Sequence, residues 1–151
     1  MSYATVKEVL DYSQKLHHQT AIMFEQLRDK TQRERVDMVM KMLAAHEEHQ
    51  AATTAAIRDD TSTEVLSEWH QLQVQQLGDI VDDCRNCHDD LSADELTDLA
   101  LKINDYLIAL YEQLAAEASS SRSRELFKEL SSMEKVQKVQ AVRAALSAND
   151  W

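Results

Sequence analysis

The sequence contains no proline, a single glycine and few aromatic residues, which make up 5% of its 151 residues. Because proline and glycine are the residues that most often end helices and form tight turns, little in this chain interrupts a helix. Alternation of apolar and polar residues with a period of two, which is typical of a half-buried strand, is also absent. Residues that favour helices are abundant. These features predict an all-α fold, and the length predicts one domain over residues 1–151.

Positively charged residues are in the minority, 16 against 27 acidic ones, and the formal net charge is −11. Without a local basic stripe, this charge argues against nucleic acid as a partner. The sequence also lacks an 18-residue apolar run and a secretory leader, so we expect a cytoplasmic protein that has no membrane partner.

Cysteine is scarce as well, because the chain has only Cys84 and Cys87. Two cysteines do not make a disulfide framework. With His88 they match the short string at which c-type haem is attached, but attachment requires export. We therefore expect two free thiols and no covalent haem.

Two pairs of stretches repeat along the chain. At one offset of 87 residues, the stretches 16–27 and 39–50 align without a gap with 103–114 and 126–137. Phe24 then falls on Tyr111. Identical residues occupy eight further pairs of positions: 15/102, 25/112, 26/113, 27/114, 41/128, 43/130, 47/134 and 50/137. The repeat predicts a duplicated helical hairpin.

Apolar residues at helical spacing predict four long helices, two in each half of the chain, and a connecting helix between the halves. We expect the connecting helix to carry the chain from one end of the bundle to the other, so that one long crossover joins the two hairpins. The first helix should run from about Thr5 to Lys30. Capping boxes at 31–34, 61–64 and 92–95 should open the second helix, the connecting helix (through Trp69, Leu72 and Val81) and the third helix, and the serines at 119–121 should precede the fourth.

Polar residues interrupt the inward apolar stripes of the four long helices at one level. Each hairpin has one such residue on its first helix and a Glu-x-x-Gln pair on its second, and the i, i+3 spacing places both members of a pair on one face. This is the layout of a di-metal carboxylate site. The six residues, called the polar layer below, are His17, Glu47, Gln50, Asn104, Glu134 and Gln137.

This register resembles the rubrerythrin branch of the ferritin-like superfamily. The resemblance is carried by an aromatic residue seven positions after the first ligand position and by Leu-x-x-x-Glu-x-x-Gln at 43–50 and 130–137. It implies a ferritin-like four-helix bundle, metal ligands at the six polar-layer positions and a possible homodimer. The chain departs from the family in having His17 and Asn104 for glutamates and Gln50 and Gln137 for histidines, so two of four carboxylates remain.

Three interpretations of the polar layer stay open: a hydrogen-bonded remnant, one divalent ion (Fe, Mn or Zn) on Glu47, Glu134 and His17, or a complete di-iron site. The first predicts a non-catalytic protein with a structural or regulatory role, acting through association of helix surfaces. The others predict a metal-binding oxidoreductase or a metal-storage protein. His18, His46 and His49 are interpreted as surface or interhelical histidines.

The repeat also predicts that Glu47 and Glu134 lie close together in the middle of the bundle. Two buried carboxylates cannot both ionise there without help from a cation, a shared proton or a protonated His17. Because amides can donate hydrogen bonds to carboxylates, we expect a proton-sharing network rather than two metal ions. Both carboxylates should lie within hydrogen-bonding or single-bridge distance of His17, Gln50 or Gln137.

Overall fold

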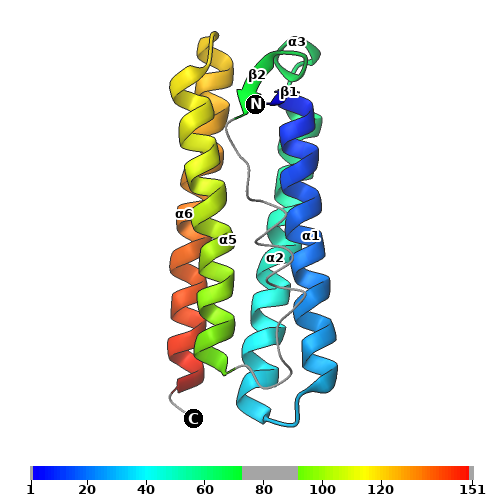
Figure 1. The fold of residues 1–151 in the computed structure, drawn as a ribbon, viewed down its shortest axis with the longest axis vertical. Helices are drawn as coiled ribbons and strands as arrows, with labels where there is room; N and C mark the ends of the chain where they lie inside the picture. The colour runs from blue at the N-terminus through cyan, green and yellow to red at the C-terminus, as the bar shows by residue number, and fades with distance from the viewer. Residues whose placement is uncertain (1, 73–91, 150–151) are drawn as a thin grey trace.

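The computed structural model describes residues 2–72 and 92–149, and four long helices stand side by side in it (Figure 1). They are α1 (Val6–Lys30), α2 (Glu34–Asp60), α5 (Ala93–Glu117) and α6 (Ser121–Asn149). The predicted all-α bundle is therefore confirmed. Within the described ranges, no helix has the length and apolar character that crossing a membrane requires.

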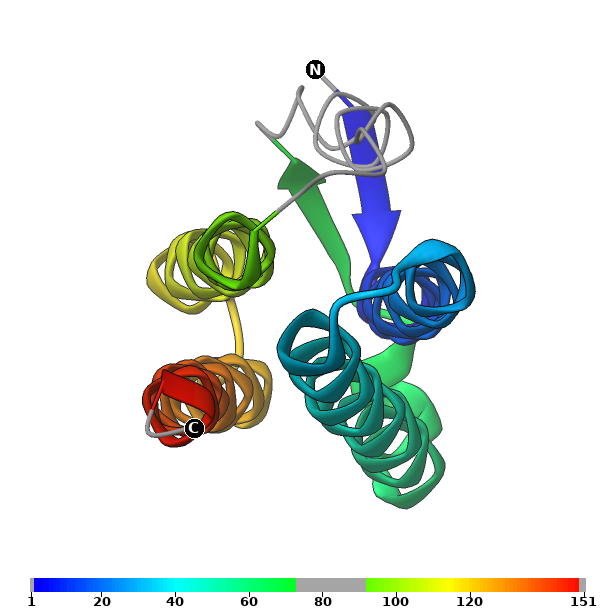
Figure 2. The same ribbon diagram turned by 90° about the horizontal axis from the view of Figure 1, so that it is seen from below.

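The helices form two antiparallel hairpins, α1 with α2 and α5 with α6 (Figure 1). Helix α2 ends at one end of the bundle and α5 begins at the other, which confirms the long crossover between the hairpins. Viewed along the bundle, the two hairpins lie side by side, and α2 is the helix of the first hairpin that packs against both α5 and α6 (Figure 2).

The starts of the helices agree only in part with the predicted capping boxes. Ser92 caps α5 as predicted: its hydroxyl accepts from the Glu95 N–H, and the Glu95 carboxylate accepts from the Ser92 N–H. The box predicted at 31–34 is wrong, since Arg33 precedes α2 without a side-chain cap. Thr31 instead lies at the end of α1, where its N–H donates to the Arg28 carbonyl.

The predicted connecting helix is also wrong over its described residues. Ser62 caps α3 (Thr63–Leu66), but α3 ends after four residues. The chain then forms β2 (Trp69–Leu72), which pairs antiparallel with β1 (Ser2–Thr5). Strand β1 thus supplies backbone hydrogen-bonding partners for residues 69–72. A helix prediction from local sequence takes no account of partners so distant along the chain. The rest of the predicted helix, and Cys84 and Cys87, lie outside the described residues.

The buried core has two apolar clusters, one on each side of the polar layer. The cluster near the β1–β2 ribbon includes Leu10, Leu107 and Phe127, and the other includes Phe24 and Leu96. Each long helix takes part in both clusters, either with buried residues or with partly buried residues packed against them. The polar layer therefore lies at mid-bundle with apolar packing above and below it. The fold therefore isolates the polar layer from water.

Candidate functional site

The six residues of the polar layer are all buried, with relative exposures between 0 and 4%. Equivalent positions have matching burial: Glu47 and Glu134 are both 3% exposed, and Gln50 and Gln137 are both 4% exposed. The duplicated register therefore places the two halves of the layer in comparable surroundings. All six predicted residues are brought to one level of the bundle.

His17 joins the two glutamates of the layer. Its Nδ1 lies 2.6 Å from Glu47 Oε2, and its Nε2 lies 2.6 Å from Glu134 Oε1. Asn104 Nδ2 donates to the other oxygen of Glu134, Oε2, over 2.8 Å. The contact between His17 and Glu134 joins the two hairpins, because His17 belongs to α1 and Glu134 to α6.

The same hydrogen bond occurs in each hairpin. His17 bonds to Glu47 and Asn104 bonds to Glu134, in both cases across 30 residues. A residue on the first helix thus contacts the glutamate of its own second helix. The hairpins differ in that His17, with a second ring nitrogen, also reaches the other hairpin.

The two contacts of His17 require two protons, which are shared among the side chains of His17, Glu47 and Glu134. An imidazole can face a carboxylate favourably from both nitrogens only if it is protonated, or if one carboxyl group is. Burial alone would lower the pKa of His17, but hydrogen bonds to Glu134 and Glu47 and their charges raise it to about 10. Burial raises the pKa of Glu47, and the charge of Glu134 acts in the same direction against the lowering effect of His17. An imidazolium between two carboxylates satisfies both contacts, and so does a neutral imidazole that accepts from a protonated Glu47.

This arrangement does not fit a two-metal centre. Such a centre requires more carboxylates and histidines than the layer contains, each with a free lone pair. Both ring nitrogens of His17 face carboxylates, and Asn104 occupies a further oxygen of Glu134. Across residues 2–72 and 92–149, no group of three or more His, Cys, Asp or Glu side chains is arranged to hold a metal ion. With its pKa raised to about 10, the imidazole ring can itself supply a positive charge between the glutamates.

The glutamines and the outer histidines complete the description of the predicted residues. In the described part of the chain, neither the Gln50 nor the Gln137 side chain makes a hydrogen bond, so the expected donation to the carboxylates comes from His17 and Asn104 instead. His18 is exposed and contacts Glu48 at 2.9 Å. His49 is exposed and His46 is half-buried, as interpreted from the sequence.

Buried hydroxyl groups beside the layer were missed as functional candidates. Ser13 and Tyr111 are fully buried, and burial raises the pKa of Tyr111, with the charge of Glu134 adding to this effect. The sequence analysis assigned no role to either residue. The signal was present in the repeat, because Tyr111 falls on Phe24 and differs from it by one hydroxyl group.

Comparisons with known proteins bear on the fold. Neither the protein-family models nor the curated proteins gave a match. Among solved structures, a Thermotoga maritima protein described as a ferritin-like diiron-carboxylate protein is similar, with a TM-score of 0.61 and 16% sequence identity. The match covers 96% of this chain and 97% of that one. At this identity the likeness concerns the fold, and the chain has the ferritin-like fold of an all-α helical bundle.

Proposed function

We propose that this chain is a non-catalytic ferritin-like protein with a structural or regulatory role, in which protonated His17 takes the place of metal as the cation between two carboxylates. The pair of 2.6 Å contacts from His17 to Glu47 and Glu134 carries the proposal. Two buried carboxylates repel each other strongly in a medium of low dielectric constant. The imidazolium removes that repulsion without an external ion.

The structural part of the role concerns how the two hairpins are aligned. Buried polar contacts can select one register of packed helices over others even where they add little stability. The contact between His17 and Glu134 crosses between the hairpins. A shift of one hairpin along the bundle axis would break this contact, whereas the apolar clusters on either side would tolerate it. The polar layer would therefore fix the register of the bundle.

An apolar row on the outer face of α6 supports a role through association. Val136, Val139, Val142 and Leu146 recur at spacings of three and four residues and are 38 to 59% exposed. Contiguous exposed apolar surface of this kind marks interaction sites more often than chance. We take a second copy of the chain as the partner, in line with the expected homodimer.

The first test is the metal content of protein purified without chelators. We expect less than one equivalent of iron, manganese and zinc combined by mass spectrometry, because the imidazolium excludes a cation from between the carboxylates. The variant Glu47→Ala/Glu134→Ala should have the same metal content as the wild type. One or more equivalents in the wild type, lost in the variant, would overturn the proposal.

That opposite result would support the second candidate, a metal-binding oxidoreductase or metal-storage protein. The convergence of two carboxylates and one imidazole at mid-bundle favours it, as does the absence of hydrogen bonds to the Gln50 and Gln137 side chains among the described residues. If His17 turned away, the carboxylates and an amide oxygen would offer a site for one divalent ion such as iron, manganese or zinc.

The second test concerns the apolar row. We expect the wild type to be a dimer by sedimentation velocity and Val139→Glu to be a monomer, because the new carboxylate would be desolvated at the interface. Ile22→Glu, at an exposed apolar residue of α1, is the matched control and should remain dimeric. A monomeric wild type at the highest soluble concentration would refute the association.

A further inference from the structure

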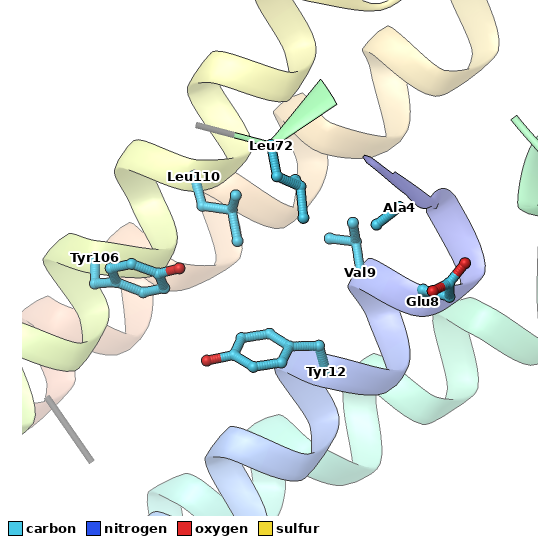
Figure 3. A pocket seen from close by; sticks show the side chains of 7 residues that line it. All are labelled: Ala4, Glu8, Val9, Tyr12, Leu72, Tyr106 and Leu110. Atoms are coloured by element: carbon cyan, nitrogen blue, oxygen red, sulfur yellow. The ribbon is translucent and has the colours of Figure 1, made fainter. Parts of the chain in front are cut away.

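A cavity of about 260 Å³ lies between α1 and α5, at the end of the bundle that carries the β1–β2 ribbon (Figure 3). Its aliphatic wall comes from both helices and both strands. Tyr12 and Tyr106 line the remainder, and Glu8 lies at its edge with its carboxylate engaged by Thr5. The aliphatic residues are Ala4, Val9, Leu72 and Leu110. The cavity is separate from the polar layer.

The polar part of the cavity contains a hydroxyl group without a partner. Tyr12 and Tyr106 extend toward each other from the facing helices α1 and α5 (Figure 3). The Tyr12 hydroxyl is buried and, among the described residues, has no hydrogen-bond partner. Leaving a buried hydroxyl unpaired is unfavourable, because the group loses its hydration without gaining a partner. A buried donor of this kind next to a cavity is the feature that a bound polar group would explain.

Further hydroxyls lie behind Tyr12, toward the polar layer. Ser13 Oγ and the Tyr111 hydroxyl are likewise buried, and a hydrogen bond with Ser13 lowers the pKa of Tyr111 against the larger raising effect of burial. Tyr111 lies near enough to Tyr12, Tyr106 and Glu134 for their charges to raise its pKa. Ser13 and Tyr111 do not line the cavity, so the hydroxyls that a ligand would meet are those of Tyr12 and Tyr106.

We propose that this cavity is a binding site for a small neutral phenol, with the ring against the aliphatic wall and the hydroxyl hydrogen-bonded to Tyr12. A cavity of about 150 Å³ is enough for benzene, so the present one admits a ring with one or two substituents. Aromatic rings from two sides suit an aromatic ligand. The inference stands independently of the function proposed above.

The charge of the ligand follows from the lining. The described residues that line the cavity include no Lys or Arg, and among them Glu8 is the one group with a formal charge. Burial raises the pKa of Tyr12 and of Tyr106, so both stay neutral and available as donors. An anionic ligand would lose its hydration without gaining a counter-ion.

The test is a titration of the full chain with 4-ethylphenol, followed by methyl NMR signals of Val9, Leu72 and Leu110. Ethylbenzene, which lacks the hydroxyl, should bind about three- to tenfold more weakly, and so should 4-ethylphenol to Tyr12→Phe. The anion 4-ethylbenzoate should bind at least about tenfold more weakly than 4-ethylphenol. Tyr3→Phe, at an exposed tyrosine of β1 outside the cavity, is the matched control and should bind normally.

Ala4→Leu should fill the cavity and abolish binding. If that variant does not fold, Tyr12→Phe alone decides the matter. Three results would each overturn the proposal: no binding of 4-ethylphenol at millimolar concentration, equal binding of 4-ethylbenzoate, or unchanged affinity in Tyr12→Phe. A crystal soaked in 4-ethylphenol that contains only ordered water at Tyr12 would do the same.

Discussion

Replacing His17 by alanine should destabilise the protein by about 3–5 kcal/mol, the range observed when one partner of a buried ion pair is removed. The substitution leaves Glu47 and Glu134 buried and without the imidazole that bonds to both. Urea unfolding at pH 7 measures the loss. His18→Ala is the matched control, because His18 is the neighbouring residue and its exposed contact with Glu48 should contribute no more than about 1 kcal/mol.

The pH dependence of stability separates loss of charge from loss of packing. The pKa of His17 is raised to about 10 in the folded protein, above its usual value of 6.5. Its stabilisation is therefore complete below pH 6.5 and is lost as the pH rises from there through about 10. The raised pKa of Glu47 acts in the same sense, since the folded state again holds the proton more tightly.

The wild type should therefore lose unfolding free energy between pH 7 and 10, with a slope of up to about 1.4 kcal/mol per pH unit for each proton. The His17→Ala variant should lack the part of this slope that belongs to the imidazole. Because the three groups titrate together, the slope reports on the triad of Glu47, His17 and Glu134. Identical pH profiles of wild type and variant would show that His17 is not the counter-ion.

The inward faces of the four helices could be predicted because their periodicity and the 87-residue repeat give the same answer. The β1–β2 ribbon could not, because it depends on pairing between residues 2–5 and 69–72, which are distant in sequence. Four-residue strands also have too little periodicity to be recognised. The wrong capping box shows a related limit. Thr31 follows one helix and precedes another, and the local sequence does not show which of the two helices it caps.

The sequence also predicted which residues form the polar layer and that His17, Gln50 or Gln137 would reach both carboxylates, but it did not choose between His17 and the glutamines. Spacing places Glu47 and Gln50 on one face, whereas side-chain rotamers decide that His17 and Asn104, not the glutamines, contact the carboxylates. No pattern in the sequence predicted the cavity. Tyr12 and Tyr106 come from different hairpins, and at the offset of 87 they fall on Leu99 and Gln19, so the repeat does not mark them.

Replacing the bonded part of the polar layer with apolar residues should have an effect opposite to that of His17→Ala. Buried ion pairs are expensive to desolvate, and well-packed apolar replacements are often neutral or stabilising by about 1–4 kcal/mol. We expect this result for a variant in which leucine replaces His17, Glu47, Asn104 and Glu134 together. Gln50 and Gln137 need no change, because within the described residues their side chains bond to none of these four.

The single variant His17→Leu is the control, because it introduces the same apolar side chain but removes the imidazole from both carboxylates and leaves Glu134 with Asn104 alone. It should be about as unstable as His17→Ala, so the difference between the single and the fourfold variant isolates the unpaired charges. A fourfold variant that is less stable than the wild type by more than about 3 kcal/mol would contradict this account. The layer would then contribute net stability, and not only register.

The same fourfold variant tests whether the polar layer fixes the register of the hairpins. Without the contact between His17 and Glu134, the two apolar clusters merge into one continuous apolar core that can pack in more than one register. We therefore expect a stable helical protein whose amide NMR spectrum shows broadened or doubled signals for α5 and α6. A single sharp set of signals, together with unchanged stability, would mean that apolar packing alone aligns the hairpins and that the polar layer has no structural role.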